Sequence, residues 1–366
     1  MPIQTAADSI SNSAGSPYGF KNRIINGAMA IDQRNSGSST TPSGDAYNLD
    51  RWQAASGTAG SWFTFQQSNV VPANFTYSLS ILSTGANSVS SGSIYVLQQR
   101  IEGYNVADLG YGSSDAKPIT ISFWIRGSVT GTYGLVVTNG AMTRAYPITY
   151  TINSANTWEY KIVTISGDTS GTWLKDNGIG MRLVFQLGTG SSNTLTAGTG
   201  WVTPSGGAYG VTGTTNLSAT NAATLYITGV QVEKGSQATA FDYRDYGNEL
   251  RLCQRYYYQR NIISTSTDYI AVLQCFNTGG VYGKLFDLPV TMRATPTGSM
   301  SSITHFRAST SGGNGTTSFS AGSIDVLSPA AVGTQGWSGI SGLTGGNATV
   351  ITASTVPSWI AVSAEL

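Results

Sequence analysis

Short segments in which apolar and polar residues alternate, separated by clusters of Gly, Ser, Asn or Pro, recur along this chain. Ile119 to Gly127 is the clearest, with Ile119, Ile121, Phe123 and Ile125 on one face. A period of two residues is that of a β-strand with one buried face. Further strands are expected at Trp62 to Gln67, Phe75 to Leu82, Ser93 to Ile101, Tyr133 to Thr138, Tyr146 to Ile152, Thr157 to Ile165 and Gly180 to Leu187. Many short strands with almost no helical period predict an antiparallel sandwich or jelly roll.

The alternation gives way to a different period close to residue 247. Thr224 to Glu233 still alternates, and we expect it to lie beside an early strand and close a first domain. From Gly247 the apolar residues share one face of a helix, which Asn248 can cap. A strand followed by a short amphipathic helix predicts a joint between domains. The apolar face is a candidate oligomer or interdomain interface that a monomer could also bury internally, and it consists of Leu250, Cys253, Tyr256 and Tyr257.

The length of 366 residues exceeds what one hydrophobic core usually organises, so two domains are expected. We predict an N-terminal arm or attachment segment over residues 1–20, a jelly-roll domain over 21–246, a helical connector over 247–260 and a C-terminal β-domain over 261–366. Ile24, Met29 and Ile31 are expected in the first core, and Trp52 as a buried anchor. The predicted fold class is all-β, an antiparallel jelly-roll sandwich followed by a short helix and a second, smaller β-sandwich.

The composition argues against several classes of function. Charged residues make up 10% of the chain, the net charge is +1 and no run of Lys or Arg occurs, so the basic footprint of a nucleic-acid binder is missing. No segment approaches the roughly 18 to 20 consecutive apolar residues of a membrane span. The first residues lack the basic region and apolar core of a secretion signal. We expect neither nucleic-acid binding nor membrane insertion.

Few residues offer catalytic or redox chemistry. His305 is the one histidine, and no nucleophile elbow surrounds a serine, so a Ser-His-Asp triad is not expected. Cys253 and Cys275 are too few for a disulfide framework or a zinc site and are interpreted as buried thiols. The acidic residues are scattered, in pairs such as Asp168 with Asp176. We expect a protein that is not an enzyme, with polysaccharide depolymerase as an alternative.

Sugar binding is the function that the side chains favour most. Because the apolar residues of Ile119 to Gly127 face the core, Trp124 and Arg126 are turned outward. Aromatic rings stack on the C–H face of a pyranose, while amide and guanidinium groups bond its hydroxyls. Gln98 and Arg100 offer similar groups on what we expect to be a neighbouring strand. A subunit interface at Trp124 is the competing interpretation.

A long stretch between Leu187 and Leu225 is low in charge and carries two large rings, Trp201 and Tyr209. Loops of this length inside a compact domain are usually functional or mobile. The two rings are therefore further candidates for contact with a glycan. The alternative is that Trp201 folds back to cover the sandwich.

Four segments carry a resemblance to a known family. They are KNRIINGAMAIDQRNSG at residues 21–37, YNLDRWQ at 47–53, ITISFWIRGSVTGTYGLVV at 119–137 and GVQVEKGSQATAFDYRDYGNELRLCQRYYY at 229–258. In this order they resemble phage tail-fibre and related virion structural proteins that contain a jelly-roll domain of the carbohydrate-binding type. The resemblance covers most of residues 21–260, and its motifs are typical of framework and not of a catalytic site.

This resemblance implies a surface appendage of a virion, assembled in the host cytoplasm and exposed on the particle. The expected function is host adsorption through a cell-surface polysaccharide or lipopolysaccharide, by a homotrimer held to other tail or capsid proteins through its N-terminal arm. A structural head-decoration, knob or tail subunit is the alternative. Jelly rolls of this type often hold one structural calcium, for which Asp32, Glu233 and Asp242 are candidate ligands; no other cofactor is expected.

Overall fold

The computed structural model describes residues 21–57, 62–265, 268–309 and 318–366. The chain divides into two compact units, the first ending at Glu249 and the second running from Leu250 to Glu365. Each unit has a hydrophobic core of its own, as expected for a chain of this length. The arm predicted over residues 1–20 lies outside the described residues. Almost all regular structure in the described ranges is β, so the all-β class is confirmed.

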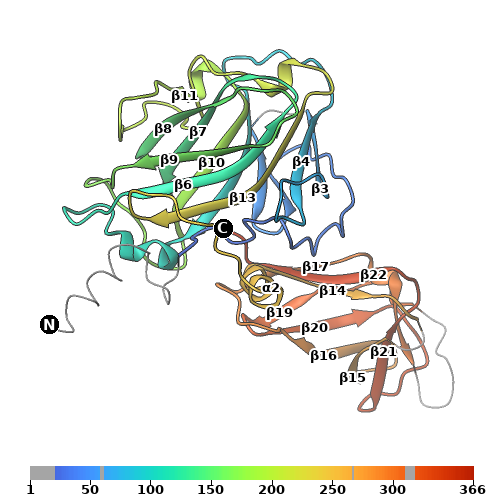
Figure 1. The fold of residues 1–366 in the computed structure, drawn as a ribbon. Coiled ribbons are helices and arrows are strands. Elements are labelled where there is room, and N and C mark those ends of the chain that lie inside the picture. Colours follow the sequence, from blue (N-terminus) through green and yellow to red (C-terminus); the bar gives the residue numbers. More distant parts are fainter. Residues whose placement is uncertain (1–20, 58–61, 266–267, 310–317) are drawn as a thin grey trace, which may run out of the picture. The chain divides into compact units, whose positions relative to one another are not determined.

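Two antiparallel sheets form the first unit (Figure 1). One has six strands, in the spatial order β1 (Ala46–Leu49), β2 (Trp52–Ser56), β5 (Ile94–Glu102), β10 (Ile179–Thr189), β7 (Gly131–Asn139) and β8 (Ala145–Ile152). The other has five, in the order β3 (Phe63–Ser68), β4 (Ser78–Ser83), β13 (Thr224–Lys234), β6 (Ile119–Gly127) and β9 (Glu159–Ile165). The two sheets enclose one core around Trp52, Phe123 and Phe185. This is the predicted jelly-roll sandwich.

The closing strand β13 lies at the centre of the five-stranded sheet, between β4 and β6 (Figure 1). The beginning of the described chain runs along it, because the N–H of Arg23 donates to the carbonyl of Val232 at 2.9 Å. Ile24, Met29 and Ile31 are buried as predicted. The first and last segments of the unit are thus held together.

Most predicted strands agree with the structure to within two residues, but the segment from Phe75 to Leu82 differs. Strand β4 begins only at Ser78, so Phe75 belongs to the loop between β3 and β4. Asn74 has a φ of +70°, in the left-handed region that Asn tolerates better than most residues. This turn separates Phe75 from the strand and leaves its ring to lie elsewhere on the sheet.

The stretch after β10 folds over the outer side of the six-stranded sheet. It contains the 3₁₀ helices η3 (Ser191–Asn193) and η4 (Leu217–Ala219) and a short parallel pair, β11 (Thr194–Leu195) and β12 (Gly210–Val211). A small apolar cluster joins it to the sheet, formed by Ala55, Val96, Val136, Ala145, Val184, Ala208 and Val211. The loop is therefore a packed cover.

The helix at the joint, α2 (Tyr246–Gln254), is shorter than the connector predicted over residues 247–260. Asp245 caps it in place of Asn248, since Asp245 Oδ1 accepts the N–H of Asn248 at 3.0 Å. The chain then enters strand β14 (Tyr257–Ile262), which pairs along its length with β22 (Ser358–Ser363). Tyrosines favour strands when a partner strand is present, and the helical period did not reveal that partner.

The side chains predicted as an oligomer or interdomain interface are mostly buried by the chain itself. Cys253, Tyr256 and Tyr257 are at most 7% exposed, and Leu250 is half-buried. These three side chains therefore offer no free surface to a second copy of the chain. A homotrimer draws no support from these positions.

The second unit is a smaller sandwich of two sheets. Its three-stranded sheet has the order β14, β22 and β17 (Thr297–Met300). Its six-stranded sheet has the order β18 (Phe306–Ser309), β21 (Ala348–Ala353), β15 (Tyr269–Cys275), β16 (Gly280–Asp287), β20 (Ala331–Ser338) and β19 (Asp325–Ser328). Phe306, Phe319 and Trp337 are fully buried in its core. The predicted second, smaller β-sandwich is confirmed.

Two features of the second unit bear on chemistry. His305 ends the 3₁₀ helix η5 (Ile303–His305). Its Nδ1 lies 2.9 Å from the Oγ of Ser301. Cys275 is a buried thiol, and burial raises its pKa. The Oγ of Ser301 also accepts the N–H of Trp359 at 3.3 Å, so this hydroxyl serves the backbone.

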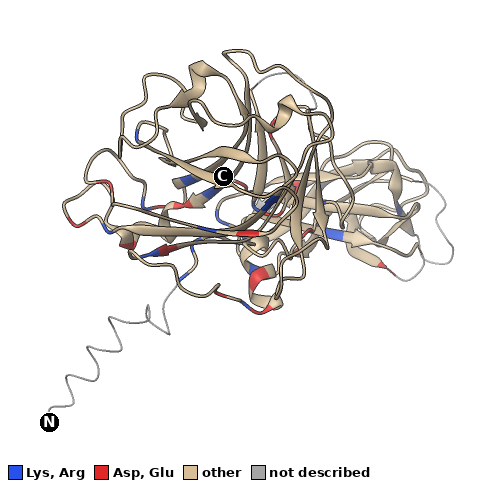
Figure 2. Ribbon diagram, turned by 45° about the horizontal axis from the view of Figure 1, so that its top comes forward, with Lys and Arg blue, Asp and Glu red and all other residues tan. Residues whose placement is uncertain are grey.

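Charged residues are scattered over the described chain. Figure 2 shows blue and red segments interspersed on a ribbon that is mostly uncharged, without a continuous basic stripe in the described ranges. No helix within those ranges has both the length and the apolar character needed to span a membrane.

One carboxyl gives the first unit a testable pH dependence. Glu159 accepts hydrogen bonds from Lys161 at 2.6 Å and from the N–H groups of Asn153 and Ser154 at 2.8 and 2.9 Å. Burial raises the pKa of Glu159, but these hydrogen bonds outweigh it and lower the pKa to about 2. A carboxyl whose pKa is lowered by folding stabilises the fold at pH values above its ordinary pKa. This stabilisation is lost as the pH falls toward 2.

We therefore expect the melting temperature of the protein to fall more steeply between about pH 4.5 and pH 2 than that of Glu159→Gln. Thermal unfolding followed by circular dichroism across this range measures both slopes. Equal slopes would show that Glu159 contributes nothing to acid sensitivity.

Candidate glycan-binding site

A bulge in β13 shapes the outer face of the five-stranded sheet. The pairing of β13 with β6 shifts between Thr228 and Gln231, and Gly229 in the bulge has a φ of +61°. A Cβ at Gly229 would stand 2.6 Å from the ring of Phe75 and 3.2 Å from the ring of Trp124. Glycine therefore lets both rings lie over the same point of the sheet.

Aromatic rings continue from this point in both directions. Trp124 packs against Tyr160 with ring centroids 5.2 Å apart. Phe75 contacts Phe241 at 5.3 Å and Tyr243 at 5.5 Å. We call these five residues the ring strip. They come from β6, β9, the loop before β4 and the segment between β13 and α2, so the fold and not the sequence brings them together.

Arg126 flanks the ring strip on the same strand as Trp124. Its guanidinium lies 5.3 Å from the ring centroid of Tyr226, and its Nε donates to the carbonyl of Asn156 at 2.8 Å. The predicted outward direction of Trp124 and Arg126 agrees with the structure, because both are half-buried while Phe123 and Ile125 belong to the core.

A cavity of about 150 Å³ lies at one end of the ring strip, and we call it the Asp242 pocket. Its aromatic wall is formed by Phe75, Phe241, Tyr243 and Tyr246. Its polar lining is formed by Asn22, Asn74, Thr76, Asp242, Arg244 and Glu249. The Oη of Tyr243 donates to the carbonyl of Asn74 at 2.8 Å and joins two of these segments. The pocket thus combines ring faces with hydrogen-bonding groups, as sugar sites do.

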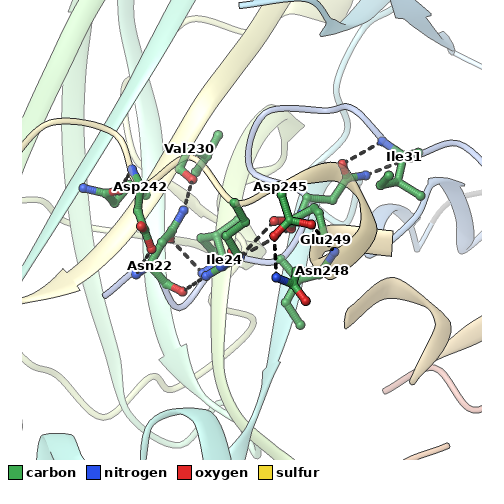
Figure 3. A network of polar contacts seen from close by, with 12 residues as sticks. Asn22, Ile24, Ile31, Val230, Asp242, Asp245, Asn248 and Glu249 are labelled. Atoms are coloured by element: carbon green, nitrogen blue, oxygen red, sulfur yellow. Dashed lines mark hydrogen bonds and ion pairs between the residues drawn. The ribbon is translucent and has the colours of Figure 1, made fainter. Parts of the chain in front are cut away.

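Asn22 organises the polar side of the pocket (Figure 3). Its Oδ1 accepts the N–H groups of Ile24 and Val232 at 2.9 and 3.1 Å, and its Nδ2 donates to the carbonyl of Val230 at 3.1 Å. Its own N–H points to Asp242 Oδ2 at 3.3 Å. A single buried amide therefore satisfies three backbone groups and fixes the chain beside Asp242.

Glu249 reaches back from α2 into the same network (Figure 3). Its Oε1 accepts the N–H of Asn26, and its Oε2 lies 3.2 Å from Arg244 Nη1. Arg244 also donates to the carbonyl of Ile24 at 3.0 Å. Arg244 and Glu249 thus tie the first turn of α2 to the beginning of the described chain.

Gln98 and Arg100 do not lie beside Trp124. They belong to β5, whose neighbours are β2 and β10 in the six-stranded sheet. The chain crosses from one sheet to the other after β5, through the 3₁₀ helices η1 (Gly103–Asn105) and η2 (Ala107–Leu109). Gln98 Nε2 donates to Gln53 at 2.8 Å, and Arg100 lies 4.0 Å from Asp45. The expectation of neighbouring strands was wrong, because successive strands of a jelly roll often alternate between sheets.

Trp201 and Tyr209 lie on the packed cover of the six-stranded sheet. Trp201 contacts the rings of Tyr111, Tyr146 and Trp173, and its Nε1 donates to the carbonyl of Ser166 at 2.7 Å. Tyr209 packs against the small apolar cluster beneath the cover. Trp201 therefore folds back onto the sandwich, which was the alternative to a ligand contact.

The three candidate calcium ligands do not form a metal site. Among the described residues no group of three His, Cys, Asp or Glu side chains lies close enough to hold a metal ion. Asp32 accepts the N–H groups of Asn35 and Gly37 at 3.0 and 2.7 Å, and Glu233 accepts that of Thr239 at 2.9 Å. These carboxylates serve loop backbone, so their arrangement does not fit a shared calcium ion.

Sequence reasoning missed four of the five rings in the ring strip. Phe75 was assigned to a strand, Tyr160 to an ordinary strand position, and Phe241 and Tyr243 to the framework of the joint. The one available signal was Gly229, an isolated glycine in a strand pattern, which often marks a bulge or a close approach.

Gly229→Ala is expected to weaken glycan binding at least about threefold, since a Cβ there displaces Phe75 from the strip. The matched control is Gly213→Ala. Gly213 has a φ of +78° with nothing within 4 Å, so it carries a similar backbone cost of about 1–2 kcal/mol and moves no ring. Isothermal titration calorimetry measures the glycan affinity of both variants. Equal affinities would show that Phe75 does not contribute to glycan binding.

The comparisons with known proteins yielded solved structures alone. No family model matches the chain. No curated protein matches it either. Similar structures include the enzymatically active domain of tailspike protein 4 from bacteriophage CBA120, at 14% identity and a TM-score of 0.31, covering 58% of this chain and 21% of that one.

Carbohydrate-binding modules also occur among the similar structures. The family 11 module from Clostridium thermocellum is 10% identical with a TM-score of 0.27, covering 51% of this chain and 91% of that one. The CBM22-1 xylan-binding domain from Paenibacillus barcinonensis is 12% identical with a TM-score of 0.25, covering 56% and 99%. Similarity at this level does not identify a ligand for the present chain.

Proposed function

We propose that the chain is a glycan-binding protein whose ring strip and Asp242 pocket together bind a carbohydrate chain. The observation that carries the proposal is the line of rings Tyr160, Trp124 and Phe75 across one sheet face, ending in a polar pocket. Successive sugar residues present C–H faces to such rings, and their hydroxyls find amides and a carboxylate at the pocket. A packing role alone does not account for the cavity beside the rings.

The proposed activity is binding without catalysis. The acid pair singled out in the sequence supports this, because each member already serves the fold. Asp168 holds Arg144 through two contacts at 2.7 and 2.8 Å. Asp176 Oδ1 accepts the N–H of Gly178 at 2.8 Å. A glycosidase instead needs two carboxyl groups facing one scissile bond.

The biological role that we propose is adsorption of a phage to its host by a tail fibre or similar appendage. The resemblance of residues 21–37, 47–53, 119–137 and 229–258 to virion structural proteins supports it. Single sugar contacts on an open sheet face are weak, and several copies per particle would raise the effective affinity by avidity. A homotrimer exposed on the virion surface, attached through residues 1–20, is part of this proposal.

A polysaccharide-binding screen tests the function. The full chain is run by affinity electrophoresis through a panel of bacterial capsular polysaccharides and lipopolysaccharides, and the same panel is assayed for new reducing ends. We expect retardation by at least one polysaccharide and no reducing ends. Absence of retardation across the panel and absence of whole-cell binding would favour a structural virion subunit, and released reducing ends would identify a depolymerase.

A further inference from the structure

We propose that the Asp242 pocket binds a sugar residue carrying a free ammonium group. The glycan on the ring strip would then contain an amino sugar whose nitrogen is not acetylated. This inference rests on the proposed function for the rest of the glycan and concerns only the pocket end of the strip. The carboxylate of Asp242, the faces of the rings and the charges around the pocket carry it.

Two of the three charges lining the pocket cancel each other. Arg244 and Glu249 form an ion pair with Nη1 and Oε2 at 3.2 Å. Arg244 also donates to the carbonyl groups of Ile24 and Asn22, and Glu249 accepts the N–H of Asn26. Both side chains are therefore held by protein groups, and neither charge is available to attract a ligand.

Asp242 is the lining charge that lacks such a partner among the described residues. Its Oδ2 accepts one long hydrogen bond, 3.3 Å from the N–H of Asn22. Its Oδ1 accepts none from the described part of the chain. The backbone N–H of Asp242 donates to Gln231 Oε1 at 2.8 Å, so the main chain is fixed while the carboxylate faces the pocket. A carboxylate placed in this way favours a ligand that brings N–H or O–H donors.

The charged side chains around the pocket add up to a negative net charge, which also favours a cationic ligand. Lys21 donates its ammonium to the carbonyl of Ala240, two residues before Asp242. Asp245 adds a second carboxylate and caps α2, which offsets the positive end of the helix. Lys21 and Arg244 against Asp242, Asp245 and Glu249 leave a net charge of −1. An acidic sugar is therefore disfavoured and a cation favoured.

The aromatic wall acts in the same direction. Phe241 and Tyr243 stand nearly perpendicular, with centroids 4.8 Å apart and an interplanar angle of 75°. Ring faces carry partial negative charge and attract an ammonium group, while the same faces accept the C–H groups of a pyranose. A protonated amino sugar offers both kinds of contact in one residue.

The position of the pocket restricts the ligand further. The pocket has a volume of about 150 Å³ and lies at one end of the ring strip. The residue that it selects is therefore a unit at that end of the bound glycan. An N-acetyl group would replace the ammonium by a neutral amide.

A charge series of monosaccharides tests the inference on the full chain by saturation-transfer difference NMR at pH 6. The probes are glucosamine and galactosamine, their neutral parents glucose and galactose, the two N-acetyl forms, and glucuronate. We expect one of the amino sugars to bind at least about tenfold more tightly than its neutral parent, and glucuronate not to bind. In Asp242→Asn, a nearly isosteric change, the amino sugar should bind as weakly as the parent.

Trp124→Ala separates this inference from the proposed function, because Trp124 does not line the pocket. That variant should keep the preference for the amino sugar and lose binding of the longer glycan. Equal binding of amino and neutral sugars, or an unchanged preference in Asp242→Asn, would overturn the ammonium site. If the longer glycan still binds in the wild type and not in Trp124→Ala, the proposed glycan-binding function stands even when the ammonium site is overturned.

Discussion

Replacing Trp124 with alanine is expected to weaken binding of the retained polysaccharide about 30-fold, which corresponds to about 2 kcal/mol. Trp124 lies at the middle of the ring strip, between Tyr160 and the point where Phe75 crosses Gly229. Its removal exposes the strand beneath and interrupts the line of rings. Calorimetric titration with oligosaccharides of that polysaccharide measures the loss.

Trp124 is half-buried on a solvated sheet face, so the variant should remain folded. The matched control is Tyr104→Ala, which removes an exposed ring of η1 that packs against none of the five rings of the strip. It should bind as the unchanged protein does. Wild-type affinity in Trp124→Ala, with a normal melting temperature, would remove the ring strip from the binding site.

Asn22→Ala is expected to produce the largest loss of stability, about 3 kcal/mol or more. Asn22 is 1% exposed and satisfies the N–H groups of Ile24 and Val232 and the carbonyl of Val230. Each buried backbone group left without a partner costs about 1–3 kcal/mol. In a unit of this size the melting temperature should fall by about 6 to 12 °C, measured by differential scanning calorimetry.

Asn221→Ala is the control for this prediction, because Asn221 is an exposed asparagine of the same unit. Its effect should stay within about 0.5 kcal/mol. A loss below about 1 kcal/mol in Asn22→Ala would show that the junction between the first segment and β13 does not depend on this amide.

The fold class and most strand positions could be predicted because a two-residue period is local. Ile119 to Gly127 needs no partner strand to show which side is buried. Strand neighbours are not local, and this is why Gln98 and Arg100 were placed beside Trp124 although they lie in the other sheet. The end of α2 was missed for the same reason, since β14 exists through its pairing with β22.

The candidate site was half predictable. The outward direction of Trp124 follows from alternation, whereas its neighbours follow from a bulge at Gly229 and a turn at Asn74. The only sign of such a positive φ in the sequence is a glycine or an asparagine at that position. Asp242 was expected as a calcium ligand, and its place in a pocket became visible only with the segment from Asn22 beside it.

The central claim is that a carbohydrate lies along the ring strip. The chain has 8 tryptophans, and their indole N–H signals in ¹⁵N-labelled protein give one reporter for each. On titration with an oligosaccharide of the retained polysaccharide, the signal of Trp124 should shift most, while those of buried Trp52 and Trp337 stay in place. Saturable shifts at Trp201 with Trp124 unmoved would place the ligand on the other sheet and contradict the claim.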